Sequence, residues 1–110
     1  MLSYEYVAGL VDGEGCIRLT PSGEKRYLRY YPRLQVTNTY VEVLVMLKEQ
    51  FGGYIGKPKR RPDSTKDCFD WRIDGDGARS LLHNLLPFLV IKREKALAVL
   101  AGDQKGQGKG

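Results

Sequence analysis

Two glycines and a carboxylate near the start of the chain, Gly9, Gly13 and Glu14, have a spacing that could build a reactive site. On a helix, residues four apart lie on one face, and a face without side chains lets a second helix approach to backbone contact distance. A glycine inside a helix costs about 1 kcal/mol relative to alanine, so two in one short helix indicate a compensating close contact. The alternative, that both glycines pack against the domain's own core, stays open.

Glu14 follows the second glycine directly, so two such helices crossing side by side would bring two carboxylates together. Clustered carboxylates repel each other unless a cation lies between them, and their oxygens suit Mg²⁺ or Mn²⁺. The chain carries one copy of this arrangement. The second carboxylate must therefore come from another chain, which predicts a symmetric homodimer. The alternative for Glu14 is a solvated acid at the start of a strand.

Basic residues gather in two stretches of a chain whose net charge is +5. Between Arg18 and Arg33 there are five basic residues and one acid, and between Lys57 and Arg72 there are six and three. Net charge alone indicates little, but clusters of this kind suit a polyanionic partner.

The cysteines and the hydropathy exclude several classes of protein. Two cysteines without paired spacing support neither a disulfide framework nor a zinc site. No uncharged apolar run approaches the roughly 20 residues of a membrane span. We expect a soluble intracellular protein without a membrane or an organic cofactor as partner, and the cytoplasm and an organelle are equally compatible with the sequence.

The elements that must position these residues follow from the apolar periodicity, which predicts one domain over residues 1–101. Ser3 is a suitable N-cap for the first helix, and the Gly52-Gly53 pair should end the second. Residues 102–110, with four glycines among polar residues, should form a disordered tail. The expected elements are helices at residues 4–13, 40–51, 77–86 and 92–101, and hairpins that join 15–20 to 28–36 and 54–59 to 66–74. An apolar stripe of Val41, Leu44, Val45 and Leu47 is expected on the second helix.

If the helices cover the apolar side of the two hairpins, the opposite face of the antiparallel sheet stays solvated. That face would mix donors, acceptors and aromatic surface, which suits base edges and phosphates. The alternative is an ordinary polar sheet face with nothing bound. Its expected members are Cys16, Arg18, Thr20, Arg29, Tyr31, Arg33, Gln35, Asp70 and Arg72.

Residues 7–15, VAGLVDGEG, resemble the LAGLIDADG motif of the homing endonucleases. The departures are mild: Val7, Val11, Gly13 and Glu14 stand for Leu, Ile, Ala and Asp. The order of elements from about residue 3 to 101 is similar to the α+β fold of that family, αββαββα, in which helices cover one face of a four-stranded antiparallel saddle-shaped sheet.

The resemblance implies roles for individual residues. Glu14 takes the metal-binding position, with the Gly13 carbonyl as a further ligand, and Lys92 takes that of a basic residue that reaches the active site. Asn38 lies where the family often has a polar residue that organises water, although Glu42 stands where some relatives carry a basic residue. The alternatives are a solvated helix-start lysine for Lys92 and a helix cap for Asn38. Asp12 would support the helix end or the interface, and the implied dimer interface is Ala8, Gly9, Asp12 and Gly13.

The implied activity is metal-dependent cleavage of both strands of a long, (pseudo)palindromic double-stranded DNA site by a homodimer, leaving 3′ overhangs. Each sheet would lie in the major groove of one half-site. Guanidinium groups of Arg18, Arg29, Arg33 and Arg72 could read guanine. The expected phosphate contacts are Lys57, Lys59, Arg60, Arg61 and Lys66.

Three other interpretations remain. The same fold could serve as an RNA-splicing maturase or a non-cleaving DNA-binding module, the chain could be one half of a two-motif enzyme, or it could be a dimerisation module with incidental basic charge.

Overall fold

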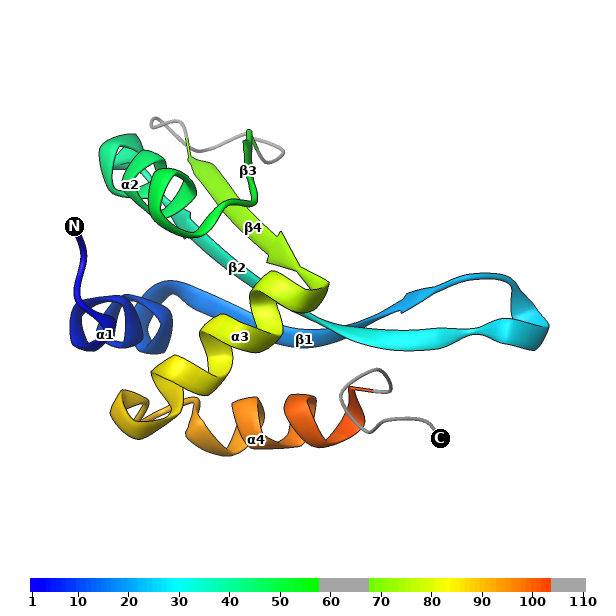
Figure 1. Cartoon of the computed structure of the whole chain (residues 1–110). Helices are drawn as coiled ribbons and strands as arrows, with labels where there is room; N and C mark the ends of the chain where they lie inside the picture. The colour runs from blue at the N-terminus through cyan, green and yellow to red at the C-terminus, as the bar shows by residue number, and fades with distance from the viewer. Residues whose placement is uncertain (58–67, 104–110) are drawn as a thin grey trace, which may run out of the picture.

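The computed structural model describes residues 1–57 and 68–103, apart from the side chain of Lys25. Four helices cover one face of a single open antiparallel sheet with strand order β1-β2-β4-β3 (Figure 1). The described elements are α1 (Tyr4–Glu14), β1 (Gly15–Ser22), β2 (Arg29–Asn38), α2 (Val41–Phe51), β3 (Tyr54–Gly56), β4 (Phe69–Asp74), α3 (Gly75–Leu85) and α4 (Arg93–Gly102), with short 3₁₀ turns at Lys25–Tyr27 and Leu86–Phe88. The predicted αββαββα order is confirmed, and α4 follows it. None of the described helices has the length and apolarity to cross a membrane.

Helix α1 begins where the sequence predicts. The Ser3 side chain accepts a hydrogen bond from the Tyr6 backbone N–H at 3.1 Å, which satisfies one of the donors left open at a helix start. Its buried residues are Val7, Ala8 and Val11, which point into the layer between the sheet and the other helices. The opposite face of α1 remains in solvent.

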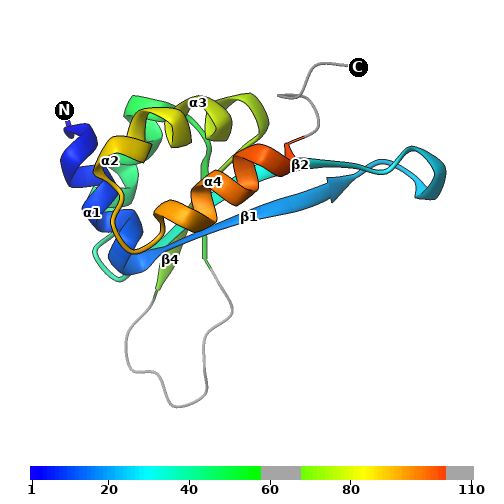
Figure 2. The same ribbon diagram turned by 90° about the horizontal axis from the view of Figure 1, so that it is seen from below.

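The core lies between the helices and one face of the sheet (Figure 2). Ile17, Leu34, Val36, Trp71 and Ile73 supply the sheet side of this core, each at most 5% exposed. Period-two alternation places their polar neighbours on the opposite face. The predicted division of the hairpin strands into an apolar and a polar side is confirmed in this central part of the sheet.

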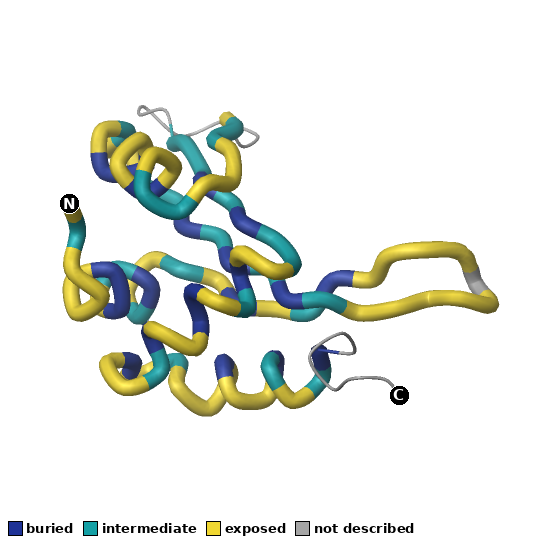
Figure 3. The backbone as a smooth tube through the Cα atoms, viewed as in Figure 1, coloured by how far each residue is buried: buried dark blue, intermediate teal, exposed yellow. Residues whose placement is uncertain are grey.

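The far end of the β1–β2 hairpin extends beyond the helices and is exposed on all sides (Figure 3). Leu28 and Tyr30, which the alternation in residues 28–36 predicts on the same side as Leu34 and Val36, are therefore 39% and 40% exposed. The core-facing series of β2 starts instead at Pro32, which is buried. The hairpin forms an arm rather than a fully covered part of the sheet.

Two glycines end α2 and turn the chain into β3. Gly53 has φ +84°, and a Cβ there would lie 2.3 Å from the carbonyl oxygen of Arg72, so no other residue fits. The indole N–H of Trp71 donates to the Gly52 carbonyl at 2.7 Å, which ties this turn to the core. The expected stripe on α2 is wrong in one position: Val43 is buried, whereas Val45 is 39% exposed.

The folded unit extends past the predicted boundary at residue 101. Gly102 is the last residue of α4, and Asp103 is 1% exposed. The Asp103 carboxylate accepts two hydrogen bonds from the Arg79 guanidinium, one of them at 2.9 Å. This pair holds the end of α4 against α3, and the expected tail from residue 104 onward lies outside the described residues.

Replacing Asp103 by alanine should lower the free energy of unfolding by about 3 kcal/mol, because it leaves a largely buried guanidinium without its main partner. Urea denaturation followed by circular dichroism at fixed protein concentration measures this. Asp76→Ala is the matched control: Asp76 also binds Arg79, but its side chain is 73% exposed, so its loss should cost less than about 1 kcal/mol. Equal losses in the two variants would contradict the proposed anchor.

Candidate active site and nucleic-acid interface

The glycine face of α1 is uncovered. Gly9 and Gly13 are exposed, and a Cβ built on either one has no described atom within 4 Å. The alternative that these glycines pack against the chain's own core is therefore wrong. A partner could reach this face to backbone distance, because nothing in the described part of the chain occupies it.

Ala8 does not share that face. Its side chain is fully buried beside Val7 and Val11 in the chain's own core. The prediction that Ala8 belongs to an intermolecular interface is therefore wrong. The reason is the helical period: Ala8 lies about 100° from Gly9, on the side that meets the sheet.

Glu14 is the last residue of α1, and its side chain is exposed. The helix ends at Gly15, whose N–H bonds to the Val11 carbonyl. A Cβ on Gly15 would lie 2.8 Å from that oxygen, so only glycine allows the chain to pass directly from α1 into β1. Glu14 thus lies at the direct junction of α1 and β1, with its side chain exposed.

Asp12 holds the segment before α4 against the end of α1. Its carboxylate accepts hydrogen bonds from the backbone N–H of Val90 at 2.8 Å and of Lys92 at 3.0 Å. The Lys92 ammonium in turn donates to the Asp12 carbonyl at 2.7 Å. This clamp brings Lys92, distant in sequence, to the last turn of the motif helix.

These contacts also shift the acidity of Asp12. Partial burial of the carboxyl raises its pKa, but the backbone N–H groups of Val90, Lys92 and Ile91 and the charge of Lys92 outweigh this, so the pKa lies below the ordinary 3.8. Asp12 supports the helix end, as one of the two expectations had it. Its carboxylate is occupied within the chain rather than offered to a partner.

The oxygen donors at the end of α1 suit a hard divalent cation but do not surround one. Glu14 supplies a carboxylate, and the Gly13 carbonyl belongs to the last turn, where carbonyls lack helical partners. Residues 1–57 and 68–103 contain no group of three His, Cys, Asp or Glu side chains that could hold a metal ion. A cation site at Glu14 would need ligands from outside the described chain.

The Asn38 side chain acts as a local cap. Its Oδ1 accepts the backbone N–H of Tyr40 at 2.9 Å, directly before α2. Asn38 therefore has the helix-cap role that the sequence analysis gave as its alternative. The acceptor is thus engaged with the backbone, while the side-chain NH₂ group donates no hydrogen bond within residues 1–57 and 68–103.

The polar face of the sheet is a set of cross-strand rows. Arg18 pairs with Arg33 and Arg33 with Asp74, while Cys16 pairs with Gln35 and Gln35 with Arg72. The third row joins Thr37 to Asp70. The Gln35 amide donates to Asp70 Oδ2 at 3.0 Å, which leaves Asp70 Oδ1 buried and without a hydrogen bond among the described residues.

The four expected base-reading arginines fall into two groups. Arg18 and Arg29 are exposed and make no hydrogen bond or ion pair within the described residues. The Arg33 guanidinium donates a hydrogen bond to Asp74, and this bond raises the pKa of Arg33. Burial lowers that pKa, but the charge of Asp74 raises it further, so the net shift is upward. Arg72 lies over the Tyr54 ring, 4.3 Å from its centroid.

The remaining predicted contacts differ in accessibility. Thr20 shares the polar face by register, but it is only 8% exposed, so little of its side chain is accessible for the predicted contact with DNA. Tyr31 is half-buried and Cys16 is exposed. Lys57 is exposed just after β3, while Lys59, Arg60, Arg61 and Lys66 lie outside the described residues.

Three residues of this face were not predicted from the sequence: Thr37, Tyr54 and Asp74. Extending the alternation by one step from Gln35 reaches Thr37, and from Arg72 it reaches Asp74. The signal was present for both. Tyr54 required the register of β3 against β4, which pairs it with Arg72.

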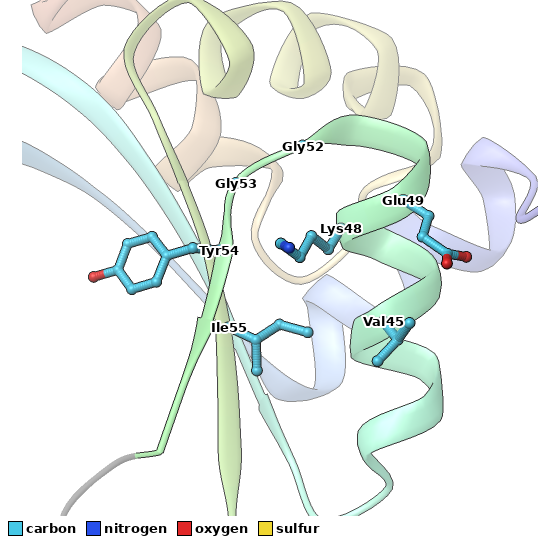
Figure 4. A pocket seen from close by; sticks show the side chains of 7 residues that line it. All are labelled: Val45, Lys48, Glu49, Gly52, Gly53, Tyr54 and Ile55. Carbon is cyan, nitrogen blue, oxygen red and sulfur yellow. The ribbon is translucent and has the colours of Figure 1, made fainter.

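A hollow between the end of α2 and β3 belongs to a different part of the molecule (Figure 4). Lys48 and Glu49 line it from the helix and Ile55 from the strand, whereas Tyr54 points out of the other side of β3. The hollow contains none of the predicted site residues.

Comparisons with known proteins agree with this architecture. No family model matches the sequence. DNA endonuclease I-CvuI of Chlorella vulgaris is 30% identical over 105 residues, which are 90% of this chain and 62% of that protein. A crystal structure of the homing endonuclease I-CvuI in complex with its target superposes with a TM-score of 0.69 at 26% identity, over 89% of this chain and 63% of that one. The homing endonuclease I-TnaI gives 0.63 at 26% identity, over 91% and 72%.

The chain has the motif and the fold of the LAGLIDADG homing endonucleases. The predicted resemblance is confirmed, as is the α+β fold class. The chain spans 62% of the length of I-CvuI, so the likeness covers part of that protein and not the whole of it.

The Asp12 clamp predicts a specific acid sensitivity. Because the folded pKa is lowered, Asp12 stabilises the fold above its unfolded pKa of about 3.9, and this stability is lost as the pH falls through the lower folded value. Between about pH 4 and 2, the free energy of unfolding of Asp12→Asn should fall less steeply than that of the wild type. Glu94→Gln is the control, since that exposed carboxylate makes no described hydrogen bond. Identical slopes for wild type and Asp12→Asn would disprove the clamp.

Proposed function

We propose that this chain binds double-stranded DNA and, as a symmetric homodimer, hydrolyses both strands of a (pseudo)palindromic site with Mg²⁺ or Mn²⁺. One observation carries the proposal. An exposed Glu14 ends a helix whose glycine face no described residue covers, directly before β1, a strand of the sheet whose polar face carries the exposed Arg18 and Arg29.

The dimer follows from the bare face of α1. Two copies of this helix can cross at Gly9 and Gly13 with backbones in contact, since no side chain keeps them apart. A two-fold axis through this crossing brings the two Glu14 carboxylates to the same region. Each copy contributes what the other lacks, a second acidic group.

The chain's own groups have distinct tasks in this assembly. The two Glu14 carboxylates and the Gly13 carbonyls would hold the divalent ions together with the scissile phosphates. Bound there, such ions lower the pKa of water and neutralise charge on the leaving 3′ oxygen. Lys92, kept at the end of α1 by Asp12, offers a positive charge that stabilises negative charge developing on the phosphate.

The sheet supplies binding. Its polar face would lie in the major groove of one half-site, where Arg18 and Arg29 can bond to guanine, while Lys57 contacts phosphate. The relatives support DNA binding in general terms: I-CvuI was crystallised with its target in the presence of calcium and, with uncleaved DNA, in the presence of magnesium. The proposed products are duplex ends with 3′ overhangs.

Glu14→Gln should abolish Mg²⁺-dependent cleavage of a plasmid that carries candidate sites, because the amide no longer holds the ion, while DNA affinity stays within about threefold. Candidate sites come from selecting cleaved members of a randomised library with the wild type. Glu42→Gln removes an exposed carboxylate on α2 and should leave cleavage unchanged. If the wild type binds DNA but does not cleave with Mg²⁺ or Mn²⁺, the chain is a maturase or a non-cleaving module instead.

Gly9→Leu should weaken dimerisation by about 2 kcal/mol, roughly thirtyfold in the dissociation constant, because the new side chain separates the two helices. The folded monomer should be unharmed, since the position is open within the chain. Sedimentation equilibrium measures the dissociation constant of the dimer, and circular dichroism measures whether the monomer stays folded. Ala98→Leu, on the exposed side of α4, is the matched control. A wild-type chain that stays monomeric with and without DNA contradicts the symmetric model.

A further inference from the structure

Asp74 holds two arginines of the polar sheet face at once. Its carboxylate accepts hydrogen bonds from Arg33 Nε at 2.7 Å and from Arg33 Nη2 at 3.3 Å, in the two-pronged geometry of a strong guanidinium–carboxylate pair. Arg72 Nε lies 3.6 Å from the second carboxylate oxygen. A single acidic residue therefore sits between two of the four arginines expected to read bases.

Packing fixes this cluster further. Arg33 and Asp74 are direct cross-strand partners of β2 and β4, and the Arg33 side chain is 16% exposed. Arg72 is pressed on the Tyr54 ring, which β3 presents on the side away from α2 (Figure 4). The Arg33 guanidinium cannot move to a new partner without breaking its two hydrogen bonds to Asp74. Arg72 is placed instead by its stacking on the Tyr54 ring and by the charge of Asp74, and among the described residues its buried Nε makes no hydrogen bond.

Arg18 and Arg29 differ from Arg33 and Arg72 in exposure and in bonding. Both are exposed, and within residues 1–57 and 68–103 neither makes a hydrogen bond or an ion pair. Besides reaching a guanine in the target, such side chains can bind a phosphate of any other duplex, so on non-target DNA they add affinity without sequence information. Within the described residues, the sheet face thus carries exposed arginines without a bond next to arginines that contact Asp74.

On the basis of the proposed function, we propose that Asp74 is a specificity-determining residue: by bonding Arg33 and lying beside Arg72, it withholds positive charge from the phosphates of non-target DNA. Arginine has five N–H donors, and Asp74 takes two of those of Arg33. The bond to Asp74 sets the direction of the other three, so an acceptor of the duplex engages them only where it lies along that direction. Specificity then arises because binding to the wrong duplex is weakened more than binding to the right one.

The test measures equilibrium binding of a non-specific duplex by fluorescence anisotropy, without divalent metal, over a range of salt concentrations. Asp74→Asn keeps the shape but removes the charge that holds the arginines. It should tighten non-specific binding roughly tenfold at low salt and steepen the salt dependence by about one unit of the log–log slope, the signature of one more neutralised phosphate.

Asp76→Asn is the matched control. It changes the net charge equally and lies two residues away, but its partner is Arg79, not an arginine of the sheet face. The control should change non-specific affinity less than threefold. The double variant Arg33→Gln with Asp74→Asn should lose most of the gain seen in Asp74→Asn, since Arg33 is the group released.

A measurement on the unaltered protein guards against misfolded variants. Hydrogen exchange at the side-chain Nε–H, followed by NMR, should be slower for Arg33 than for Arg18, both in the free protein and on the non-specific duplex. Equal exchange rates, or equal effects of the Asp74 and Asp76 variants, would overturn the role of Asp74. A wild-type protein that binds no DNA overturns the proposed function instead, so the two failures are distinguishable.

Discussion

Helix α1 is packed on one side only, and the rest of the molecule depends on that asymmetry. Val7, Ala8 and Val11 are fully buried, and burying a valine side chain stabilises a fold by about 1.5–3 kcal/mol. This side fixes the helix against the sheet. The other side carries two glycines with no neighbour among the described residues. Each glycine lowers the stability of the helix, and no contact within the described chain compensates for that cost. The two glycines on this uncovered face are therefore explained only by a contact from outside the described residues.

The polar face of the sheet follows from the same two-layer construction. Strands that bury Ile17, Leu34 and Trp71 against the helices must turn their alternate residues to solvent. Cross-strand pairing then decides which of these polar groups are free, because a carboxylate placed opposite a guanidinium engages it before any ligand arrives. Charge alone does not describe this surface: the arginines of one sheet face divide into exposed ones and ones already bonded to Asp74.

The sequence predicts the local features of this fold well, because they depend on neighbouring residues. Ser3 caps the first helix, the Gly52-Gly53 pair ends the second, and the alternation in β2 identifies its two faces. The sequence does not predict contacts between residues that lie far apart in the chain. The pair of Arg33 and Asp74 joins strands 41 residues apart, and Lys92 reaches Asp12 across 80. Leu28 is exposed because the hairpin outruns the helices, a matter of relative lengths that periodicity does not contain.

The direct passage from helix to strand at Gly15 links the proposed chemistry to the proposed reading of DNA. No loop separates the Glu14 carboxylate from β1, so the distance from it to each side chain of the strand is set by covalent geometry. At about 3.3 Å per residue, Arg18 lies about 13 Å along the strand from Glu14, close to the rise of four base pairs. A chain that hydrolyses DNA at Glu14 would thus cut at a fixed offset from the bases that its sheet contacts. The two-fold axis that joins two such chains would fix the spacing between the two half-sites in the same way.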